Sequence, residues 1–239
     1  MREFFTRVED GNQIIVETDM NAYAYSQKYP WLLSVFIKFD ASDENREGFE
    51  EFLETKESLI IALEHTKKAK YVGSRVVDGW SELYFYADDS KGLDKIVADI
   101  LAPSNYVYES HTVRDTKWDF HYKNLTPTEL ELAHIQSQKI IYLLEEEGDE
   151  LTSVRPVEHY ISFDTPTQKE RFLETLKLEK FQFKDEISSE EFENGIALVR
   201  EHSVVEEELV KVVTELFEVM KEQKGYYEGW STTLVKKEQ

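Results

Sequence analysis

The sequence predicts an α+β protein of two tandem domains, each an antiparallel sheet with two helices on one face. Three observations lead to this fold class. Strand-like alternation and helix-like apolar spacing follow one another in the same order in both halves, a capped helix with an acidic run separates the halves, and Asp-Gly pairs join neighbouring strands. A length of 239 residues accommodates two domains of ordinary size.

The first half is expected to open with a hairpin, because Asp10-Gly11 separates two alternating segments and both residue types tolerate positive φ. A strand, a helix, two strands joined at Asp78-Gly79, a second helix and two further strands should follow. Their expected ranges are 31–39, 47–66, 70–77, 80–87, 92–101, 105–113 and 117–122. Tryptophans fall within several of these strands, where packing on a half-buried surface is their simplest role.

A helix is expected to connect the two halves. Thr126 can cap it, Pro127 fits its first position, and Glu129 can complete a capping box. The acidic run 145–150, which contains Gly148, marks its end. We therefore expect domains at 1–135 and 136–239, with the connector at about 124–152.

The second half is predicted in the order strand, capped helix, strand, strand, helix and strand. Thr165-Pro166 should cap the first helix, Ser203 and Glu206 should open the second, and Gly225 should lie near its end. The strands are expected at 156–163, 178–185, 195–202 and 226–235, and the middle two should pair as a hairpin. This β-α-β-β-α-β order is the ferredoxin-like arrangement, and the first half repeats it after an extra hairpin.

Composition excludes several functional classes. The 28 Lys and Arg against 49 Asp and Glu give a net charge of −21, which disfavours nucleic acid and anionic membranes. The chain has no cysteine, so disulfides, thiol nucleophiles and Cys-ligated metals are excluded. No uncharged apolar run approaches the ~18 residues of a membrane span, and the first residues lack a signal-peptide pattern. These features predict a cytoplasmic protein.

The sequence contains none of the glycine-rich phosphate loops, HExxH or GxSxG motifs that indicate catalysis. Turn and strand spacing could bring together four weak candidates for metal binding, although a turn role for Asp115 and strand-edge roles for the histidines are the simpler explanation: His111, Asp115, Asp119 and His121. His159 falls on the apolar face of its strand and is expected to be a hydrogen-bonded core histidine. We therefore predict no catalytic residue, no bound metal and no cofactor.

The second half also carries a family resemblance. Its strand ends Phe163-Asp164-Thr165-Pro166, its first helix has Phe172 and Leu176, and it closes with Gly225-Tyr226-Tyr227-Glu228-Gly229-Trp230. From Val157 to Val235 the sequence thereby resembles the RraB family, the regulator of ribonuclease activity B, known as protein inhibitors of ribonuclease E. Glu228 stands where the family's motif has Asp, which keeps the charge. The residues matching that motif are Gly225, Tyr227, Glu228, Gly229 and Trp230.

The first half resembles a bacterial family known only as domain-of-unknown-function family 695. The matching pieces are residues 71–75, the turn Asp78-Gly79, the strand 82–86, Trp118 and Tyr122. Such domains occur fused ahead of RraB-like modules, so this resemblance supports the domain boundary but implies no chemistry.

The leading functional hypothesis is a non-catalytic, acidic regulator of RNA turnover. The RraB resemblance implies that it binds a basic or disordered protein segment of a ribonuclease, and the negative charge would steer such a partner. Acidic residues in one loop and in the first turn of the last helix are candidate contacts, although solvation and the helix dipole also explain them: Glu186, Glu190, Glu191, Glu193, Glu206, Glu207 and Glu208. The alternatives are a metal-dependent hydrolase in an interdomain cleft and an assembly module without a regulatory role.

Overall fold

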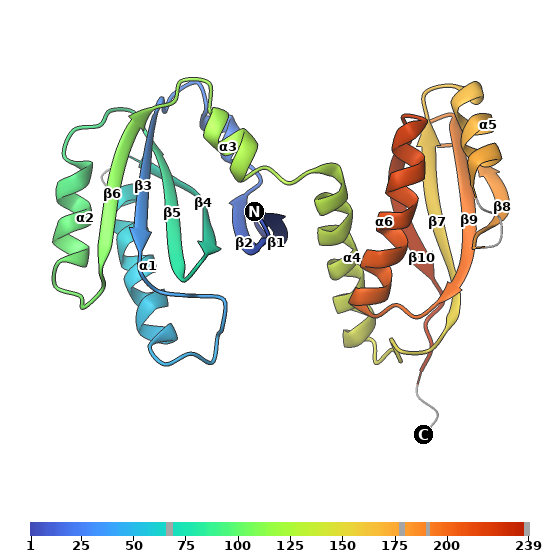
Figure 1. Cartoon of the computed structure of the whole chain (residues 1–239), viewed down its shortest axis with the longest axis horizontal. Coiled ribbons are helices and arrows are strands. Elements are labelled where there is room, and N and C mark those ends of the chain that lie inside the picture. The colour runs from blue at the N-terminus through green and yellow to red at the C-terminus, as the bar shows by residue number, and fades with distance from the viewer. Residues whose placement is uncertain (66–68, 177–179, 190–191, 237–239) are drawn as a thin grey trace. The chain divides into compact units, whose positions relative to one another are not determined.

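The structure is a computed structural model that describes residues 1–65, 69–176, 180–189 and 192–236. The chain forms two compact units, Met1–Pro127 and Thr128–Gln239, called unit 1 and unit 2 below (Figure 1). Each unit combines helices with one antiparallel sheet, which confirms the mixed α+β class. The division falls between residues 127 and 128, whereas the sequence pattern places it at residue 135.

Unit 1 is built on a six-stranded sheet in the order β1-β2-β4-β5-β3-β6. The predicted turns at Asp10-Gly11 and Asp78-Gly79 are confirmed, because all four residues have positive φ and each pair joins two antiparallel strands. In chain order the elements are β1 Arg2–Glu9, β2 Asn12–Asp19, the 3₁₀ helix η1 Ala22–Tyr25, β3 Trp31–Ile37, α1 Phe49–His65, β4 Ala69–Val77, β5 Trp80–Ala87, α2 Leu93–Leu101, β6 Tyr108–Arg114 and α3 Asp119–Asn124.

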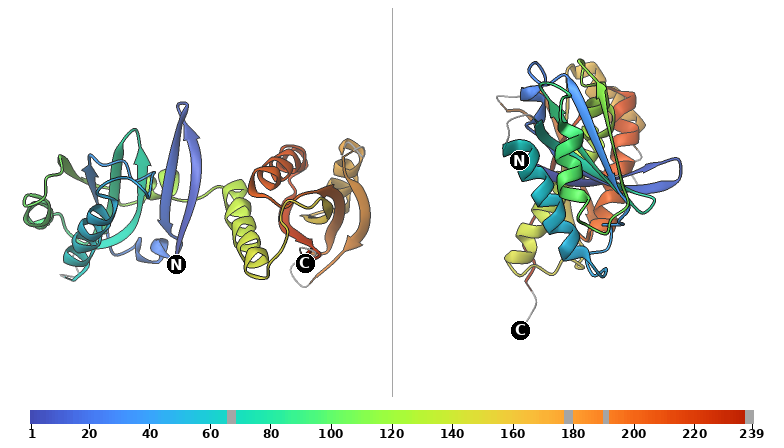
Figure 2. Two further views of the ribbon diagram at one scale, coloured as in Figure 1. Left: turned by 90° about the horizontal axis from the view of Figure 1, so that it is seen from below. Right: turned by 90° about the vertical axis from the view of Figure 1, so that its left-hand side faces the viewer.

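Helices α1 and α2 lie side by side on one face of this sheet (Figure 2, right). Leu33, Val35 and Ile37 alternate along β3 and face the apolar sides of both helices in one buried cluster. This packing follows from the strand period of two and the helix period of 3.6 that the sequence displays.

The strand predicted at 117–122 is wrong, because these residues form the short helix α3. The strand β6 ends at Arg114, and Trp118, with a φ of 58°, is the cap residue of α3. The Asp115 carboxylate accepts hydrogen bonds from the N–H groups of Asp119 and Phe120. The Trp118 indole stacks on Tyr86, with ring centroids 3.8 Å apart, which buries it completely. One helical turn thus produced the alternation that resembles a strand.

Unit 1 also contains a buried charged network. Glu17 on β2 is 4% exposed, and its carboxylate accepts hydrogen bonds from Lys56 Nζ at 2.5 Å, the Tyr71 hydroxyl at 2.9 Å and the Ser74 hydroxyl at 3.1 Å. Burial alone would raise the pKa of Glu17, but the Lys56 ammonium, these hydrogen bonds and the nearby Arg2 lower it overall. The network ties α1 to β2 and β4.

Unit 2 is built on a four-stranded antiparallel sheet in the order β10-β7-β9-β8. The predicted pairing of its two middle strands as neighbours is confirmed, since β8 pairs with β9. The first two residues of the predicted strand 178–185 lie outside the described residues, and the observed strand is β8. In chain order the elements are α4 Glu129–Glu146, β7 Arg155–Phe163, α5 Pro166–Thr175, β8 Gln182–Ile187, β9 Asn194–His202, α6 Glu206–Glu222 and β10 Tyr226–Thr232.

The helix predicted as a connector, α4, is part of unit 2. It begins two residues later than predicted, with Thr128 as cap and Glu131 completing the capping box, because the N–H of Thr126 donates instead to the His121 carbonyl at the end of α3. Ala133 and Ile141 on α4 are buried in the clusters of unit 2. None of the helices in the described part of the chain is long and apolar enough to span a bilayer.

The caps of the other two helices in unit 2 differ in their fit to the prediction. Thr165 and Gln168 form the predicted capping box at α5. Ser203 does not cap α6, because Val205 occupies that position and makes no side-chain capping bond. The first turn of α6 instead presents acidic residues to the positive end of the helix dipole.

Candidate functional site

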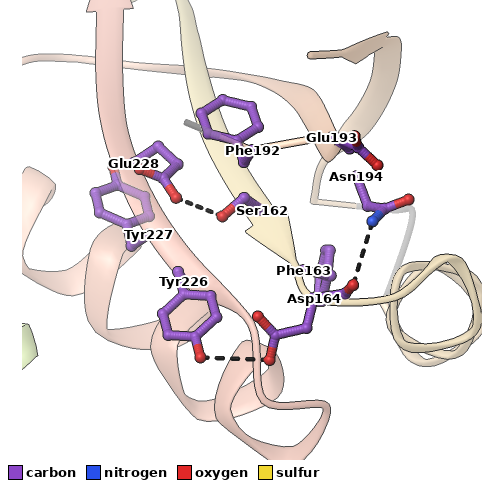
Figure 3. A pocket seen from close by; sticks show the side chains of 9 residues that line it. All are labelled: Ser162, Phe163, Asp164, Phe192, Glu193, Asn194, Tyr226, Tyr227 and Glu228. Atoms are coloured by element: carbon purple, nitrogen blue, oxygen red, sulfur yellow. Dashed lines mark hydrogen bonds between the residues drawn. The ribbon is translucent and has the colours of Figure 1, made fainter. Parts of the chain in front are cut away.

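A hollow of about 680 Å³ lies at one end of the sheet in unit 2 (Figure 3). It is formed where β7 ends and where β9 and β10 begin, so three strands that are separate in sequence supply its walls. The residues that line it are Ser162, Phe163, Asp164, Phe192, Glu193, Asn194, Tyr226, Tyr227 and Glu228. We call this hollow the sheet-end pocket.

Three carboxylates reach the sheet-end pocket from three different segments: Asp164, Glu193 and Glu228. Ser162 donates a hydrogen bond to Glu228 Oε1, and the Tyr226 hydroxyl donates to Asp164 Oδ2 at 3.4 Å (Figure 3). Because these hydroxyl hydrogens point to carboxylates of the pocket itself, the groups that remain for a ligand are mainly carboxylate oxygens. The pocket is therefore an acceptor site that suits a cation.

Four aromatic residues, among them the buried Phe163, also line the pocket. Phe192 and Tyr227 are half-buried and Tyr226 is exposed. Burial raises the pKa of Tyr227, so its hydroxyl remains protonated under physiological conditions. The combination of ring faces with carboxylates is the one that recognises guanidinium groups, which stack on aromatic rings and bond carboxylates in pairs.

The backbone of the closing motif explains how Glu228 enters the pocket. A bulge between Tyr227 and Gly229 interrupts the pairing of β10 with β7. Gly229 has a φ of 118°, a conformation that residues with a Cβ rarely adopt, so the bulge requires glycine there. Trp230 then returns to the core, where its indole donates to the Ser137 hydroxyl of α4 at 3.0 Å.

Gly225 is required for a different reason. A Cβ at this position would lie 2.6 Å from Met220 Cγ and 2.7 Å from the Phe163 ring, so the start of β10 passes close to both side chains. This close approach positions Tyr226 and Tyr227 beside the end of β7, and the motif therefore shapes the wall of the pocket.

Behind the pocket, two histidines and a tyrosine form a buried chain of hydrogen bonds. The Tyr227 hydroxyl lies 2.8 Å from His159 Nδ1, His159 Nε2 lies 3.1 Å from His202 Nε2, and His202 Nδ1 lies 2.6 Å from the Ser203 carbonyl oxygen. His159 is thus hydrogen-bonded in the core, as its place on the apolar face predicts. Burial lowers the pKa of His159 to about 3, with the neighbouring His202 and Arg200 acting in the same direction.

The acidic residues selected from the sequence are distributed over unit 2. Glu193 lines the sheet-end pocket, and Glu186 makes an ion pair with Lys169 at 2.8 Å. Glu190 and Glu191 lie outside the described residues. The first turn of α6 follows the end of β9 that is opposite to the pocket. In this turn, Glu206 accepts a hydrogen bond from Gln138 and Glu207 is exposed. Glu208 lies 3.9 Å from Arg200.

The four weak metal candidates have distinct surroundings in unit 1. His111 lies on β6 opposite Ser34, whereas Asp115 caps α3 and accepts a hydrogen bond from the Tyr86 hydroxyl at 2.6 Å. Asp119 begins α3 and His121 is buried beside Trp118. Within the described residues, no group of three or more His, Asp or Glu side chains could hold a metal ion.

Sequence reasoning missed most of the pocket. In the sequence, Asp164 stands out only as part of a strand end and Tyr226 only as part of the closing motif, and nothing marks Phe192. Asp164 and Glu228 both lie within the segments that carry the family resemblance, which is the one available signal. Their convergence depends on the register between β7 and β10, which the sequence does not display.

Two family models match the chain and confirm both resemblances. Residues 3–126 match the family of unknown function DUF695, and residues 134–232 match the regulator of ribonuclease activity B, RraB. No curated protein matches. The chain belongs to the DUF695 family, whose model covers more than half of it. The RraB match includes the whole sheet-end pocket and the closing motif.

Proposed function

We propose that this member of the DUF695 family is a non-catalytic regulator of ribonuclease activity that binds a basic or disordered protein segment through unit 2. The observation that carries the proposal is the sheet-end pocket, in which three carboxylates and four aromatic rings converge at the family's closing motif. The match to RraB supports the regulatory role, because that family regulates ribonuclease activity.

Arginine is the side chain that the pocket suits best. Its guanidinium group carries five donors in a plane, stacks on aromatic faces and is less strongly hydrated than an ammonium group. Asp164 and Glu228 offer oxygens to such donors, and Tyr226 and Phe192 offer ring faces. A lysine would satisfy the charge but would use neither the paired oxygens nor the rings as fully.

The charge of the whole chain supports the same class of partner. A net charge of −21 attracts a basic segment over a distance of about a Debye length and repels the phosphates of nucleic acid. We therefore propose a protein partner without direct binding of nucleic acid or membrane. A cytoplasmic location, where RNA turnover occurs, belongs to the same proposal.

We also propose that both units are variants of the ferredoxin-like fold and fold independently. Each contains the β-α-β-β-α-β order, and the strand order β10-β7-β9-β8 has its counterpart in β6-β3-β5-β4 of unit 1. In unit 1 the hairpin β1–β2 extends this arrangement beside β4.

Calorimetry of the full chain with a hexa-arginine peptide tests the binding site. The variant Asp164→Asn/Glu193→Gln/Glu228→Gln should weaken binding roughly tenfold, because pairs at the surface contribute about 0.2 to 1 kcal/mol each. A matched control, Glu206→Gln/Glu207→Gln/Glu208→Gln, makes the same charge change at the start of α6 and should have a much smaller effect.

Salt and the natural partner complete the test. Raising the salt concentration should weaken the wild-type complex, since the pairs are largely exposed. A pull-down from the host should recover a ribonuclease or a protein bound to one, and recovery should depend on the pocket carboxylates. Equal losses in the two triple variants would show a general charge effect and would contradict the assignment to the pocket.

A further inference from the structure

The hydrogen-bond chain behind the sheet-end pocket has a direction that its end group determines. The Ser203 carbonyl oxygen can only accept, so His202 Nδ1, at 2.6 Å, must carry a hydrogen. A neutral imidazole has one N–H, and His202 Nε2 is therefore an acceptor. His159 Nε2, at 3.1 Å, must then donate to it. His159 Nδ1 is left as an acceptor, and the Tyr227 hydroxyl at 2.8 Å donates to it.

Adding one proton at His202 reverses this direction. Nε2 of His202 would then carry a hydrogen and would donate to His159 Nε2, so His159 would have to hold its single hydrogen on Nδ1. That hydrogen would point to the Tyr227 oxygen, and the tyrosine would change from donor to acceptor. No proton is lost in the exchange, because His202 gains one from solvent and His159 changes only its tautomer.

Charged groups near the hydrogen-bond chain come from β9 and α6, which pack against it. Arg200 on β9 opposes a charge on both histidines, whereas Glu208 on α6 favours one on His202. Arg200 is itself held by Glu215 of α6 at 2.9 Å. On the remaining sides, Tyr227 of β10 and the Phe181 ring contact His159, and neither carries a charge.

We propose that His159 and His202 are positioning residues of the sheet-end pocket, and that a proton at His202 weakens the binding of a basic segment there. Tyr227 links the two, since it lines the pocket and is held from behind by His159. The proton adds a positive charge behind a cation site and removes the hydrogen bond that Tyr227 donates. The effect on binding rests on the proposed function, whereas the direction of the chain does not.

The direction is tested on the wild-type chain labelled with ¹⁵N-histidine. Long-range proton–nitrogen spectra at pH 7.5 should show His159 protonated at Nε2 and His202 at Nδ1, with signals assigned by His159→Gln and His202→Gln. On acidification, His202 should take up a proton first, and His159 should change to the Nδ1 tautomer in the same pH range. A His159 that is protonated at Nδ1 at pH 7.5 would overturn the proposal.

Binding of the hexa-arginine peptide tests the regulatory part. Wild-type affinity should fall at least threefold from pH 7.5 to 5.5, a range in which free carboxylates remain ionised. The variant His202→Gln keeps an acceptor toward His159 and a donor toward Ser203 but cannot titrate, so its affinity, whatever its value at pH 7.5, should not change with pH. The variant His202→Leu removes both hydrogen bonds of this side chain and should bind the peptide more weakly at both pH values.

His121→Gln is the matched control, because it removes a buried histidine of unit 1 and should leave the pH dependence of binding intact. An unchanged pH dependence in His202→Gln would overturn the regulatory part even if the spectra fit. Absence of peptide binding at every pH would refute the proposed function, while the spectra would still decide the direction of the chain.

Discussion

Each unit contains one buried polar network around its sheet, and the two networks are built in opposite ways. Unit 1 buries a charge, because Glu17 accepts from Lys56 at 2.5 Å and from Tyr71 at 2.9 Å. Unit 2 buries a neutral chain, in which His159 and His202 are linked at 3.1 Å. A buried charge is stable only with its counter-charge, whereas a neutral hydrogen-bond chain is stable only when each donor faces an acceptor. The same kind of sheet can therefore hold either kind of network, and the two should fail under different conditions.

The two networks also differ in their relation to the sheet-end pocket. The network around Glu17 joins α1 to two strands and lies in a unit whose family has no known function. The hydrogen-bond chain of unit 2 ends at Tyr227, which lines the sheet-end pocket. A change in its protonation can thus reach the proposed binding site, whereas a change at Glu17 is expected to affect the stability of unit 1.

The largest effect is expected from dividing the chain. A fragment of residues 128–239 should fold, whereas one of residues 152–239 should not, because it loses α4 and leaves Arg155 without Asp149. That pair is buried, with Arg155 Nη2 2.5 Å from Asp149 Oδ1. Circular dichroism and thermal unfolding check both fragments. A cooperatively folded 152–239 fragment would mean that α4 is a connector after all.

Removing the counter-charge in unit 1 should have the next largest effect. Lys56→Met leaves Glu17 buried with fewer partners and should destabilise unit 1 by about 3 kcal/mol, the lower end expected for a broken buried pair. Glu17→Gln/Lys56→Met removes both charges and should recover part of the loss. Hydrogen exchange resolved by peptide measures each unit separately, and an equal loss of protection in unit 2 would contradict independent folding.

Acid should weaken unit 2 more than unit 1, because unit 2 contains three histidines with a lowered pKa and unit 1 contains one. Burial lowers the pKa of His134, His159 and His202 in unit 2, that of His159 to about 3, and lowers the pKa of His121 in unit 1 to about 4. Unfolded histidines bind protons at higher pH than these folded ones, so the stability they contribute is present above pH 6.5 and is lost as pH falls below it.

Glu17 acts in a lower range. Its folded pKa is lowered from 4.5, so its contribution to unit 1 is present above that pH and is lost as pH falls through the folded value. Hydrogen exchange at pH 7, 5.5 and 4 should show the larger loss of protection in unit 2. Loss of protection in unit 1 at pH 5.5 with unit 2 unchanged would reverse the comparison.

The smallest effect is expected at the junction of the units. Thr128→Ala removes the cap of α4 and should destabilise unit 2 by about 1 kcal/mol. Thr126→Ala, two residues earlier, should leave unit 2 unchanged, because Thr126 bonds His121 of unit 1. Denaturant unfolding followed by exchange in α4 measures both. If Thr126→Ala destabilised unit 2 more than Thr128→Ala does, Thr126 would be the cap of α4, as the sequence predicts.

Local chemistry explains which elements the sequence predicted well. The Asp-Gly turns and the capping box at Thr165 depend on residues within four positions of one another, and all were identified. The elements that were misjudged depend on distant contacts. Trp118 precedes a helix and stacks on Tyr86, which is distant in sequence, and Thr126 does not cap α4 because its N–H and its hydroxyl both bond the His121 carbonyl.

The α+β class and most of the element order follow from the sequence, because periodicity, turns and caps are properties of short segments. Both family resemblances likewise rest on local motifs. That α4 belongs to unit 2 depends on the packing of its buried residues against that unit, which only the folded structure shows. The meeting of Asp164, Glu193 and Glu228 in one pocket, and the bonds of His159 to His202 and Tyr227, depend on the register between strands that are far apart in sequence. That register is set by the packing of the whole sheet.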